Sequence, residues 1–231
     1  MQGGVDDRDV YSFRRRDDYF HDIPDHYGTA AIVDEISKQN LDKSCGRDGI
    51  HIRLFRVLMD TAFLDYLSHL YRLCAVTGRT PRIWNESDIH LIVKKKDGPM
   101  EAGNLRPITL INVFRKLFER LLLREFDPSA GGWARLHLNQ AGFRYGYSTS
   151  TNAAVVHHLL STKACDRAIF LDLRAAFDRV DHRKLHDILL SRTCSPRVLS
   201  LLSSLMFEDV RSRVIVNGRA SRYFHRTRGV L

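Results

Sequence analysis

Hydrophobic and polar residues follow two different rhythms along the chain, and each rhythm predicts a type of element. In several stretches the apolar residues recur every three or four positions, which is the spacing of one face of a helix. Thr29, Asp181 and Ser195 stand where such stretches begin, and their side chains suit an N-cap. The pattern predicts helices over residues 29–40, 51–76, 112–122, 151–161, 181–191 and 195–206.

Other stretches alternate or form short apolar runs, and these predict strands. The segment "SDIHLIV" alternates, and Asp97-Gly98 follows it as a turn. Asn217-Gly218 separates "RSRVIV" from "RASRYFHR", and this dipeptide is the strongest short signal for a hairpin. The apolar run Ala168–Leu171 predicts a buried strand.

Asp172 directly follows that predicted strand. A lone carboxylate in a buried strand costs several kcal/mol unless a positive group meets it. The carboxyl end of a strand is also where α/β folds place ligand chemistry. From this segment alone, two interpretations remain about equally open: a ligand-binding carboxylate, or a helix N-cap or buried ion-pair member.

Composition narrows the class of protein. Of 231 residues, 44% are hydrophobic and 10% aromatic, which is typical of a globular chain with a sizeable core. No apolar run is long enough to cross a bilayer, and no signal peptide follows Met1. The four cysteines are isolated, which argues against disulfides and zinc knuckles. We therefore expect a nuclear or cytoplasmic protein that is neither secreted nor membrane-bound.

The charge balance indicates the kind of partner. Lys and Arg number 36 against 27 Asp and Glu, so the net charge is +9. A basic chain favours polyanions, most often nucleic acid. The stretch 211–228 holds six arginines and no acid. A solvated surface is the usual meaning of a charge run, but the lack of acid favours phosphate contacts, and we expect them from Arg213, Arg222 and Arg226.

Five longer segments carry a family resemblance. They are "KSCGRDGIHIRLF", "WNESDIHLIVKKKDGPMEAGNLRPITLINVFRKLFERLL", "NQAGFRYGYSTSTNA", "IFLDLRAAFDRVDH" and "VIVNGRASRYFHRTRGVL". In this order they resemble the first half of a reverse transcriptase of the non-LTR retrotransposon (LINE-like) type. The resemblance runs from about Leu41 to the last residue.

The resemblance implies an α+β architecture, the right-hand polymerase fold, with fingers and an incomplete palm whose antiparallel sheet is packed by helices. It implies an RNA-directed DNA polymerase whose partners are an RNA template, a DNA primer and deoxynucleoside triphosphates. The oligomeric state stays open. We expect a polar leader at 1–28, a helical extension of the fingers at 29–85, fingers at 86–165, a palm strand with the catalytic aspartate at 166–181, and helices and a hairpin at 182–231.

The resemblance also answers the question of Asp172. Nucleotidyl transfer uses two Mg²⁺ ions about 4 Å apart, and Asp172 matches a catalytic aspartate that binds them, with the backbone carbonyl of Leu173 as a further ligand. Phe177 matches an aromatic steric gate that excludes a 2′-hydroxyl, although such a residue is ordinarily a core aromatic. Asp178 and Asp181 are expected to cap helices or form local ion pairs.

The remaining implied contacts lie in the fingers. Arg106 matches an arginine over the incoming nucleotide, whose phosphates planar guanidinium groups bind well. Side chains of neighbouring strand residues point to opposite faces, so within the triplet Lys94–Lys96 either Lys95 or the outer pair faces inward. We expect Lys95 to meet the terminal phosphate. A solvated hairpin tip would explain the triplet about equally well. Gly142, Phe143 and Arg144 match the segment that contacts the template strand.

The sequence departs from the family pattern at its end. The Tyr/Phe-x-Asp-Asp motif, which supplies the other metal-binding carboxylates, does not occur in the 231 residues, so we expect the chain by itself to be inactive. The alternative function is a non-catalytic remnant that binds nucleic acid through the same basic surface. A phosphatase-like aspartyl nucleophile would need a second Asp two positions after Asp172, where Arg174 stands.

Overall fold

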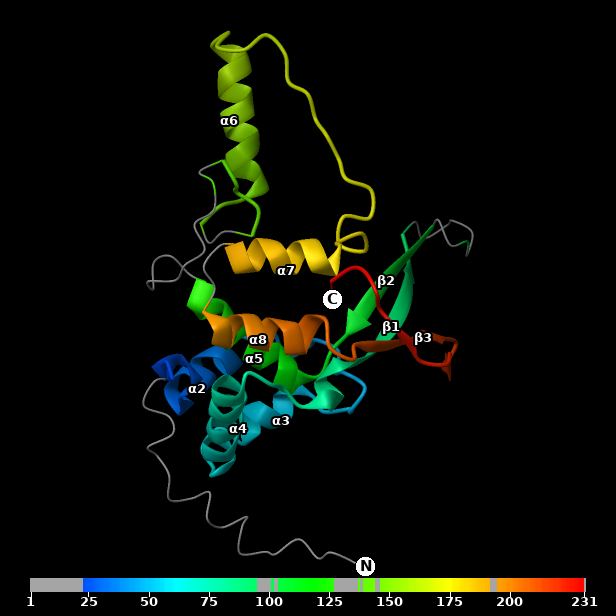
Figure 1. The fold of residues 1–231 in the computed structure, drawn as a ribbon. Coiled ribbons are helices and arrows are strands. Elements are labelled where there is room, and N and C mark those ends of the chain that lie inside the picture. Colours follow the sequence, from blue (N-terminus) through cyan, green and yellow to red (C-terminus); the bar gives the residue numbers. More distant parts are fainter. Residues whose placement is uncertain are drawn as a thin grey trace, which may run out of the picture.

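The computed structural model describes residues 23–94, 101, 104–126, 137, 139–143, 146–191 and 195–230. Most of the predicted leader and the predicted turn at Asp97-Gly98 lie outside these residues. Helices and a small sheet follow one another along the chain (Figure 1). Their bounds are η3 Asp25–Tyr27, α2 Thr29–Ser37, α3 Ile52–Val57, α4 Phe63–Thr77, η4 Arg82–Asn85, β1 Glu86–Val93, β2 Leu105–Leu110, α5 Val113–Leu123, η6 Arg124–Phe126, α6 Thr149–Ser161, α7 His182–Ser191, α8 Pro196–Met206, β3 Arg211–Val216, β4 Arg219–Ala220 and β5 Phe224–His225.

The hydrophobic core lies among α2, α3, α4, α5 and α8. Helix α5 supplies its centre, because its apolar residues at helical spacing are fully or almost fully buried. Phe118 packs against Tyr27, Tyr71 and Trp84, with ring centroids 5.4 to 5.6 Å apart. These aromatic contacts join η3, α4 and η4, which leads into β1. The body is therefore built around α5.

The predicted N-caps Asp181 and Ser195 are confirmed, and Asn112 caps the helix predicted over 112–122. Asn112 Oδ1 accepts a hydrogen bond from the amide of Arg115 at 2.8 Å and opens α5. Asp181 Oδ1 accepts from the Lys184 amide at 3.1 Å before α7, and Ser195 Oγ accepts from the Val198 amide at 3.2 Å before α8. The polar side chain at each start satisfies an amide that the helix itself leaves unpaired.

Two helix predictions need correction. The N-cap of α2 is Gly28, while Thr29 is already its first helical residue, and the helix ends at Ser37. The predicted helix 51–76 is two helices, α3 and α4. Thr61 interrupts it, because its hydroxyl accepts from the Phe63 amide at 3.3 Å and donates to the Leu58 carbonyl at 2.8 Å. Such local bonds compete with the helical ladder.

The sheet is mixed, so the predicted antiparallel sheet is wrong. The strand order is β2-β1-β3-β4, with β5 also paired to β3. β1 runs antiparallel to β2 but parallel to β3. The difference follows from the connections, because β1 and β2 are neighbours in sequence, whereas β3 follows the intervening helices α5 to α8, a crossover that can return the chain in the same direction.

The predicted hairpin at Asn217-Gly218 is confirmed. β3 and β4 pair antiparallel across this turn, with Ile215 opposite Ala220. Asn217 has a φ of 50° and Gly218 a φ of 74°. Two successive positive φ values are what the favoured two-residue hairpin turn requires, and asparagine and glycine adopt them most easily.

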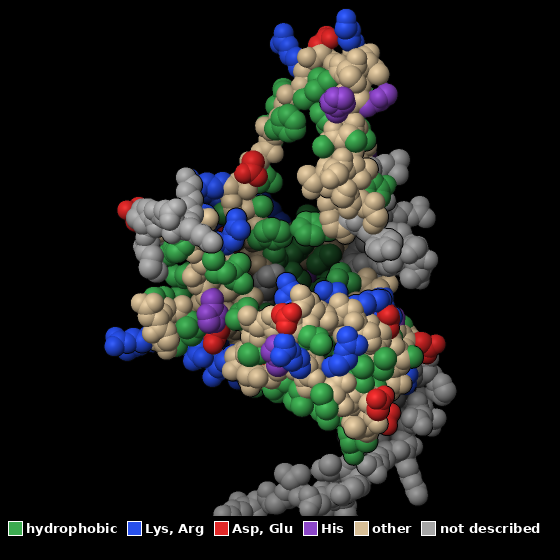
Figure 2. Space-filling view, turned by 180° about the vertical axis from the view of Figure 1, so that it is seen from behind, with side chains coloured by type: hydrophobic (Ala, Val, Ile, Leu, Met, Phe, Trp, Pro, Cys, Tyr) green, Lys and Arg blue, Asp and Glu red, His purple; other side chains and the backbone are tan. Residues whose placement is uncertain are grey.

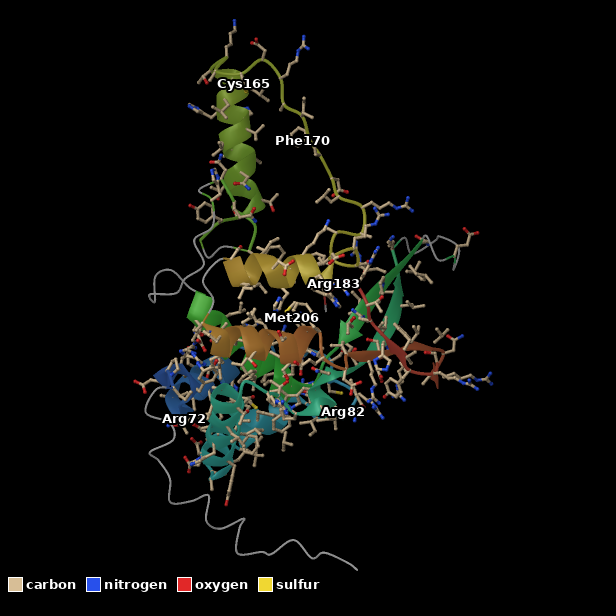
Figure 3. All side chains as sticks on the ribbon, viewed as in Figure 1. Arg72, Arg82, Cys165, Phe170, Arg183 and Met206 are labelled. Atoms are coloured by element: carbon tan, nitrogen blue, oxygen red, sulfur yellow. The ribbon has the colours of Figure 1, made fainter. Side chains whose placement is uncertain are left out.

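The predicted strand Ala168–Leu171 does not form. Helix α6 rises from the body and the chain returns to α7 as an extended arm (Figure 1). Phe170 lies on this returning segment with no element packed against it, and Cys165 lies near the tip (Figure 3). Phe170 is 83% exposed and Leu171 91% exposed. A strand needs a neighbouring backbone to pair with, and no strand among the described residues pairs with this segment.

Three cysteines and the helices bear on the expected redox state and on membrane crossing. Cys45, Cys74 and Cys165 are free thiols. No helix in the described part of the chain has the length and apolar character that a membrane crossing requires.

Candidate functional site

Asp172 lies on the exposed arm between α6 and α7. Its carboxylate has no hydrogen-bond or ion-pair partner among the described residues, so it is neither a helix cap nor a member of a buried ion pair. The neighbouring Leu173 side chain is 78% exposed. The described residues contain no group of three or more His, Cys, Asp or Glu that could hold a metal ion. Asp172 therefore offers one available carboxylate, which belongs to no such group among the described residues.

Two predicted site residues that are far apart in sequence meet in the structure. The rings of Phe143 and Phe177 pack edge to face, with centroids 6.2 Å apart and planes at 87°. Phe177 is 59% exposed and Phe143 is 94% exposed, so neither is an ordinary core aromatic. Phe143 has a φ of 61°, a conformation that is uncommon for a residue with a bulky side chain.

The turn that carries Phe177 is tied to residues near the other end of the described chain. The Val230 amide donates to the Phe177 carbonyl at 3.1 Å, and the Gly229 amide donates to the Val180 carbonyl at 2.8 Å. His182 Nε2 lies 2.7 Å from the Gly229 carbonyl oxygen. Gly229 has a φ of 83°, and a Cβ there would lie 3.0 Å from Asp178 Cα. This contact fixes the turn, and only glycine fits it without strain.

The residues expected at the nucleotide phosphates are described in part. Arg106 is exposed on β2, where its Cα pairs with that of Ile92 on β1. The Lys94 amide extends the same hairpin by donating to the Asn104 carbonyl at 2.8 Å. Lys95, like Arg144 of the expected template segment, lies outside the described residues. Gly142 is described, exposed and next to Phe143.

Two arginines of the run 211–228 pair with acids that lie outside the run. Arg213 binds Asp88 through two hydrogen bonds, 2.7 and 3.1 Å long, and also lies over the Tyr223 ring. The nearby Arg211 binds Asp209 in the same two-bonded way. The basic run is therefore compensated in part, at Arg211 and Arg213. Asp88 is 125 positions from Arg213, and the strand pairing brings them together.

Arg226 and Arg222 differ in their surroundings. Arg226 is half-buried and donates to Ser212 Oγ at 3.0 Å and to Thr109 Oγ1 at 2.9 Å. Burial lowers the pKa of Arg226, and the nearby Arg115 lowers it further although Asp178 opposes both. Arg222 is exposed. Of the three arginines expected to bind nucleic acid, Arg222 alone is both exposed and without an ion-pair or side-chain hydrogen-bond partner among the described residues.

A buried arginine that the sequence analysis missed joins the helices to the sheet. Arg115 is 1% exposed and donates to the Trp84 carbonyl at 3.1 Å and to Asn85 Oδ1 at 3.2 Å. Its Nε donates to Glu119 at 2.7 Å. Asn85 in turn donates to the Ser204 carbonyl in α8 at 2.6 Å. The sequence held one signal, because Arg115 lies three positions before Phe118, on the apolar face of α5.

A second missed cluster surrounds Glu125 at the end of α5. Tyr27 donates to Glu125 Oε1 at 2.7 Å, and Arg197 of α8 binds both carboxylate oxygens at 3.0 and 2.5 Å. His26 Nε2 lies 3.5 Å from Oε1. Burial by itself would raise the pKa of Glu125, but the nearby His26 and the hydrogen bonds from Arg197 and Tyr27 together lower it to about 2. Burial and the Glu125 charge raise the pKa of Tyr27.

The chain folds as a mixed α+β body with an exposed aspartate and a pair of exposed aromatic rings. Its sequence matches a known protein family. Residues 93–230 match the family described as reverse transcriptase (RNA-dependent DNA polymerase). Since this span covers more than half of the chain, the chain belongs to the reverse transcriptase family. The relatives described next are non-LTR, LINE-like elements.

The chain is 29% identical over 190 residues to the RNA-directed DNA polymerase from mobile element jockey of Drosophila melanogaster, a match that covers 80% of the chain and 20% of the relative. It is 32% identical over 156 residues to the probable RNA-directed DNA polymerase from transposon BS of the same species, covering 65% of the chain and 17% of the relative. The chain thus spans about a fifth of the length of the curated relatives it matches.

Proposed function

We propose that the chain forms part of an enzyme that copies RNA into DNA by two-metal nucleotidyl transfer, in a right-hand polymerase fold. The observation that carries the proposal is the family match over residues 93–230. Every residue expected to act in the site lies within that span, from Lys95 to Arg226. The division of the chain at residues 28, 85, 165 and 181 into leader, fingers and palm segments belongs to the same proposal.

Asp172 would hold Mg²⁺, with the Leu173 carbonyl as a second ligand. The chemistry fits, because Mg²⁺ prefers oxygen ligands and is held by one or two carboxylates plus substrate phosphates, and the Asp172 carboxylate is exposed and unpaired among the described residues. When bound, Mg²⁺ would stabilise the charge that develops on the transferred phosphate. A two-metal site needs further carboxylates, and the described residues form no group of three or more metal-binding side chains that includes Asp172.

Phe177 and Phe143 would stand at the boundary between nucleotide and template. A ring against the sugar excludes a 2′-hydroxyl and so selects deoxynucleotides. The edge-to-face contact with Phe143 supports this role, because it places an expected template residue directly against the expected gate. Gly142 and Arg144 would contact the template backbone beside Phe143.

The cationic residues would bind phosphate. Arg106 and Lys95 would bind the phosphates of the incoming nucleoside triphosphate, on which the nucleotidyl transfer takes place. Of the three expected hairpin arginines, Arg222 is the most available to a nucleic-acid strand, whereas Arg213 and Arg226 would touch phosphate only with their remaining donors. The partners of the whole enzyme would then be an RNA template, a DNA primer and deoxynucleoside triphosphates.

Asp172→Asn tests the proposal in a chimaera in which residues 93–230 replace the matching segment of the jockey polymerase. We expect primer extension by the parent chimaera and none by Asp172→Asn, because the metals lose a ligand. The matched control is Asp166→Asn, an exposed carboxylate on the same arm, which should extend at the parental rate. In the unmodified chain, Asp172→Asn should change the free energy of unfolding by no more than about 0.5 kcal/mol, as an exposed surface substitution does. Extension by Asp172→Asn at the parental rate would contradict the assignment.

A further inference from the structure

The turn that carries Phe177, residues 174–179, has a backbone conformation that its own sequence does not favour. Ala175 in this turn has a φ of 53°, a left-handed value that is unfavourable for a residue with a Cβ. The Arg179 amide donates to the Ala175 carbonyl at 3.2 Å and closes the turn. A strained conformation persists where the surrounding structure holds it. Contacts from outside the turn therefore decide where the Phe177 ring lies.

The segment 226–230 supplies such contacts and connects the turn to the sheet. At one end, Arg226 donates to hydroxyl groups of β3 and β2, at 3.0 and 2.9 Å. At the other end, the Val230 amide donates to the Phe177 carbonyl at 3.1 Å. Figure 1 shows this segment, in red, running from the sheet towards the junction of the arm and α7. The turn is thus fastened to the sheet through five residues.

His182, the first residue of α7, binds this segment in its middle. Its Nε2 lies 2.7 Å from the carbonyl oxygen of Gly229, which is buried. Because a carbonyl oxygen only accepts, Nε2 carries the proton and donates. The imidazole packs against the Phe207 ring, with centroids 5.0 Å apart, and the Asp181 cap fixes the helix start on which it stands. The donor is therefore held in place from two sides.

We propose that His182 is a positioning residue for the selection of deoxynucleotides. By holding the Gly229 carbonyl it fixes the segment 226–230, and through that segment it fixes the Phe177 ring against the sugar. The role rests on the proposed function, in which Phe177 is the steric gate. A gate selects by the space that it leaves, so a displacement of its ring by about 1 Å is enough to admit a 2′-hydroxyl. His182 itself touches no substrate in this scheme.

Two substitutions at His182 separate its hydrogen bond from its ring packing. His182→Phe keeps a ring against Phe207 and removes the donor, whereas His182→Gln removes the ring and keeps an N–H donor for Gly229. His186→Phe is the matched control, because His186 lies one turn further along α7 and packs on the same Phe207 ring, with centroids 6.3 Å apart. Among the described residues it makes no hydrogen bond to Gly229. His182→Ala takes the place of His182→Phe if the latter does not fold.

Amide hydrogen exchange in the chain itself measures the His182–Gly229 hydrogen bond. The amides of Gly229 and Val230 report how often the segment opens. We expect His182→Phe to speed their exchange roughly 3- to 10-fold, as the loss of one hydrogen bond does, and His182→Gln and His186→Phe to change it by less than about twofold. Parental exchange in His182→Phe, or faster exchange in His182→Gln than in His182→Phe, would overturn the positioning role.

Nucleotide selection is measured in the jockey chimaera as the ratio of kcat/KM for deoxycytidine triphosphate to kcat/KM for cytidine triphosphate. His182→Phe should lower this ratio roughly 3- to 10-fold, whereas a general structural defect would lower both kcat/KM values together and leave the ratio unchanged. Phe177→Val shortens the gate itself and should lower the ratio further.

The outcomes separate this role from the proposed function. A ratio that Phe177→Val lowers and His182→Phe leaves unchanged would overturn the positioning role alone. A ratio that Phe177→Val leaves unchanged would contradict the gate, and the positioning role would fall with it. A chimaera that does not extend a primer would contradict the proposed function, while the exchange comparison would still decide whether His182 holds the segment.

Discussion

Acid should unfold this protein partly through one carboxylate, Glu125. Its folded-state pKa is about 2, against an ordinary value of 4.5. Because the folded pKa is depressed, the stabilisation is present above pH 4.5 and is lost as the pH falls towards 2. The difference of about 2.5 pKa units corresponds to about 3.4 kcal/mol in full. Between pH 5 and pH 2.5 the linkage relation gives a loss of about 2.4 kcal/mol from this group.

The structure explains the size of the effect. Protonation of Glu125 removes the charge that Arg197 and Tyr27 bind in a largely buried site. These contacts join η3, η6 and α8, so the loss acts on elements that pack around the helical core and not on a loop. Glu125→Gln removes the titration and leaves Arg197 without its partner, which should cost about 3 kcal/mol at neutral pH.

The assay is guanidinium unfolding of the parent and Glu125→Gln at pH 5 and pH 2.5. Other acids contribute equally to both proteins, so the parent should lose about 2 kcal/mol more than the variant over this range. Asp60→Asn is the control, since Asp60 is exposed and has no ion-pair partner among the described residues; its pH dependence should parallel that of the parent. Parallel curves for the parent and Glu125→Gln would refute the reasoning.

Three further predictions concern the site and its supports. Gly229→Ala should destabilise the chain by about 1–2 kcal/mol, because its φ is 83° and the new Cβ would crowd Asp178; thermal melting measures this, and an unchanged melting temperature would contradict it. Arg222→Glu should weaken RNA binding more than Arg213→Glu once the folded fraction is matched, and equal weakening would contradict this. Binding by the parent should weaken steeply with salt, and a filter-binding titration that is insensitive to salt would contradict that expectation. In the jockey chimaera, Arg106→Ala should lower kcat/KM for the nucleotide roughly a hundredfold, for the loss of about 2–3 kcal/mol, and unchanged steady-state kinetics would exclude Arg106 from the nucleotide site.

Local signals in the sequence predicted local structure well. The caps at Asp181 and Ser195 form as expected because each depends on one side chain and an amide three residues away. The turn at Asn217-Gly218 depends only on two φ values. In each case the deciding interaction lies within a few residues, so the sequence around it contains the information.

Pairings between distant segments could not be read from the sequence. The run Ala168–Leu171 has strand composition, yet composition cannot supply the neighbouring backbone that a strand needs. The parallel pairing of β1 with β3 and the ion pair Arg213–Asp88 join residues 125 positions apart. The identity of Asp172 as a candidate site residue came from its motif, whereas its exposed position on the arm follows from the arrangement of α6 and α7.

The β1–β3 pairing also makes the two halves of the chain interdependent. The first part of the chain, up to η6, and the last part, from α7 onwards, meet in the sheet and at the Arg197–Glu125 ion pair. Between them, α6 and the arm that returns from it project from the body, and open space separates α6 from the arm (Figure 2). The covalent link through the arm is therefore not what holds the body together. If the backbone were cut within residues 165–173, the fragments would stay associated as a two-piece complex, held by the parallel strand pair and the helical core. The fold would then be maintained by complementation between fragments, and the chain could be separated at the arm into two polypeptides that reassemble.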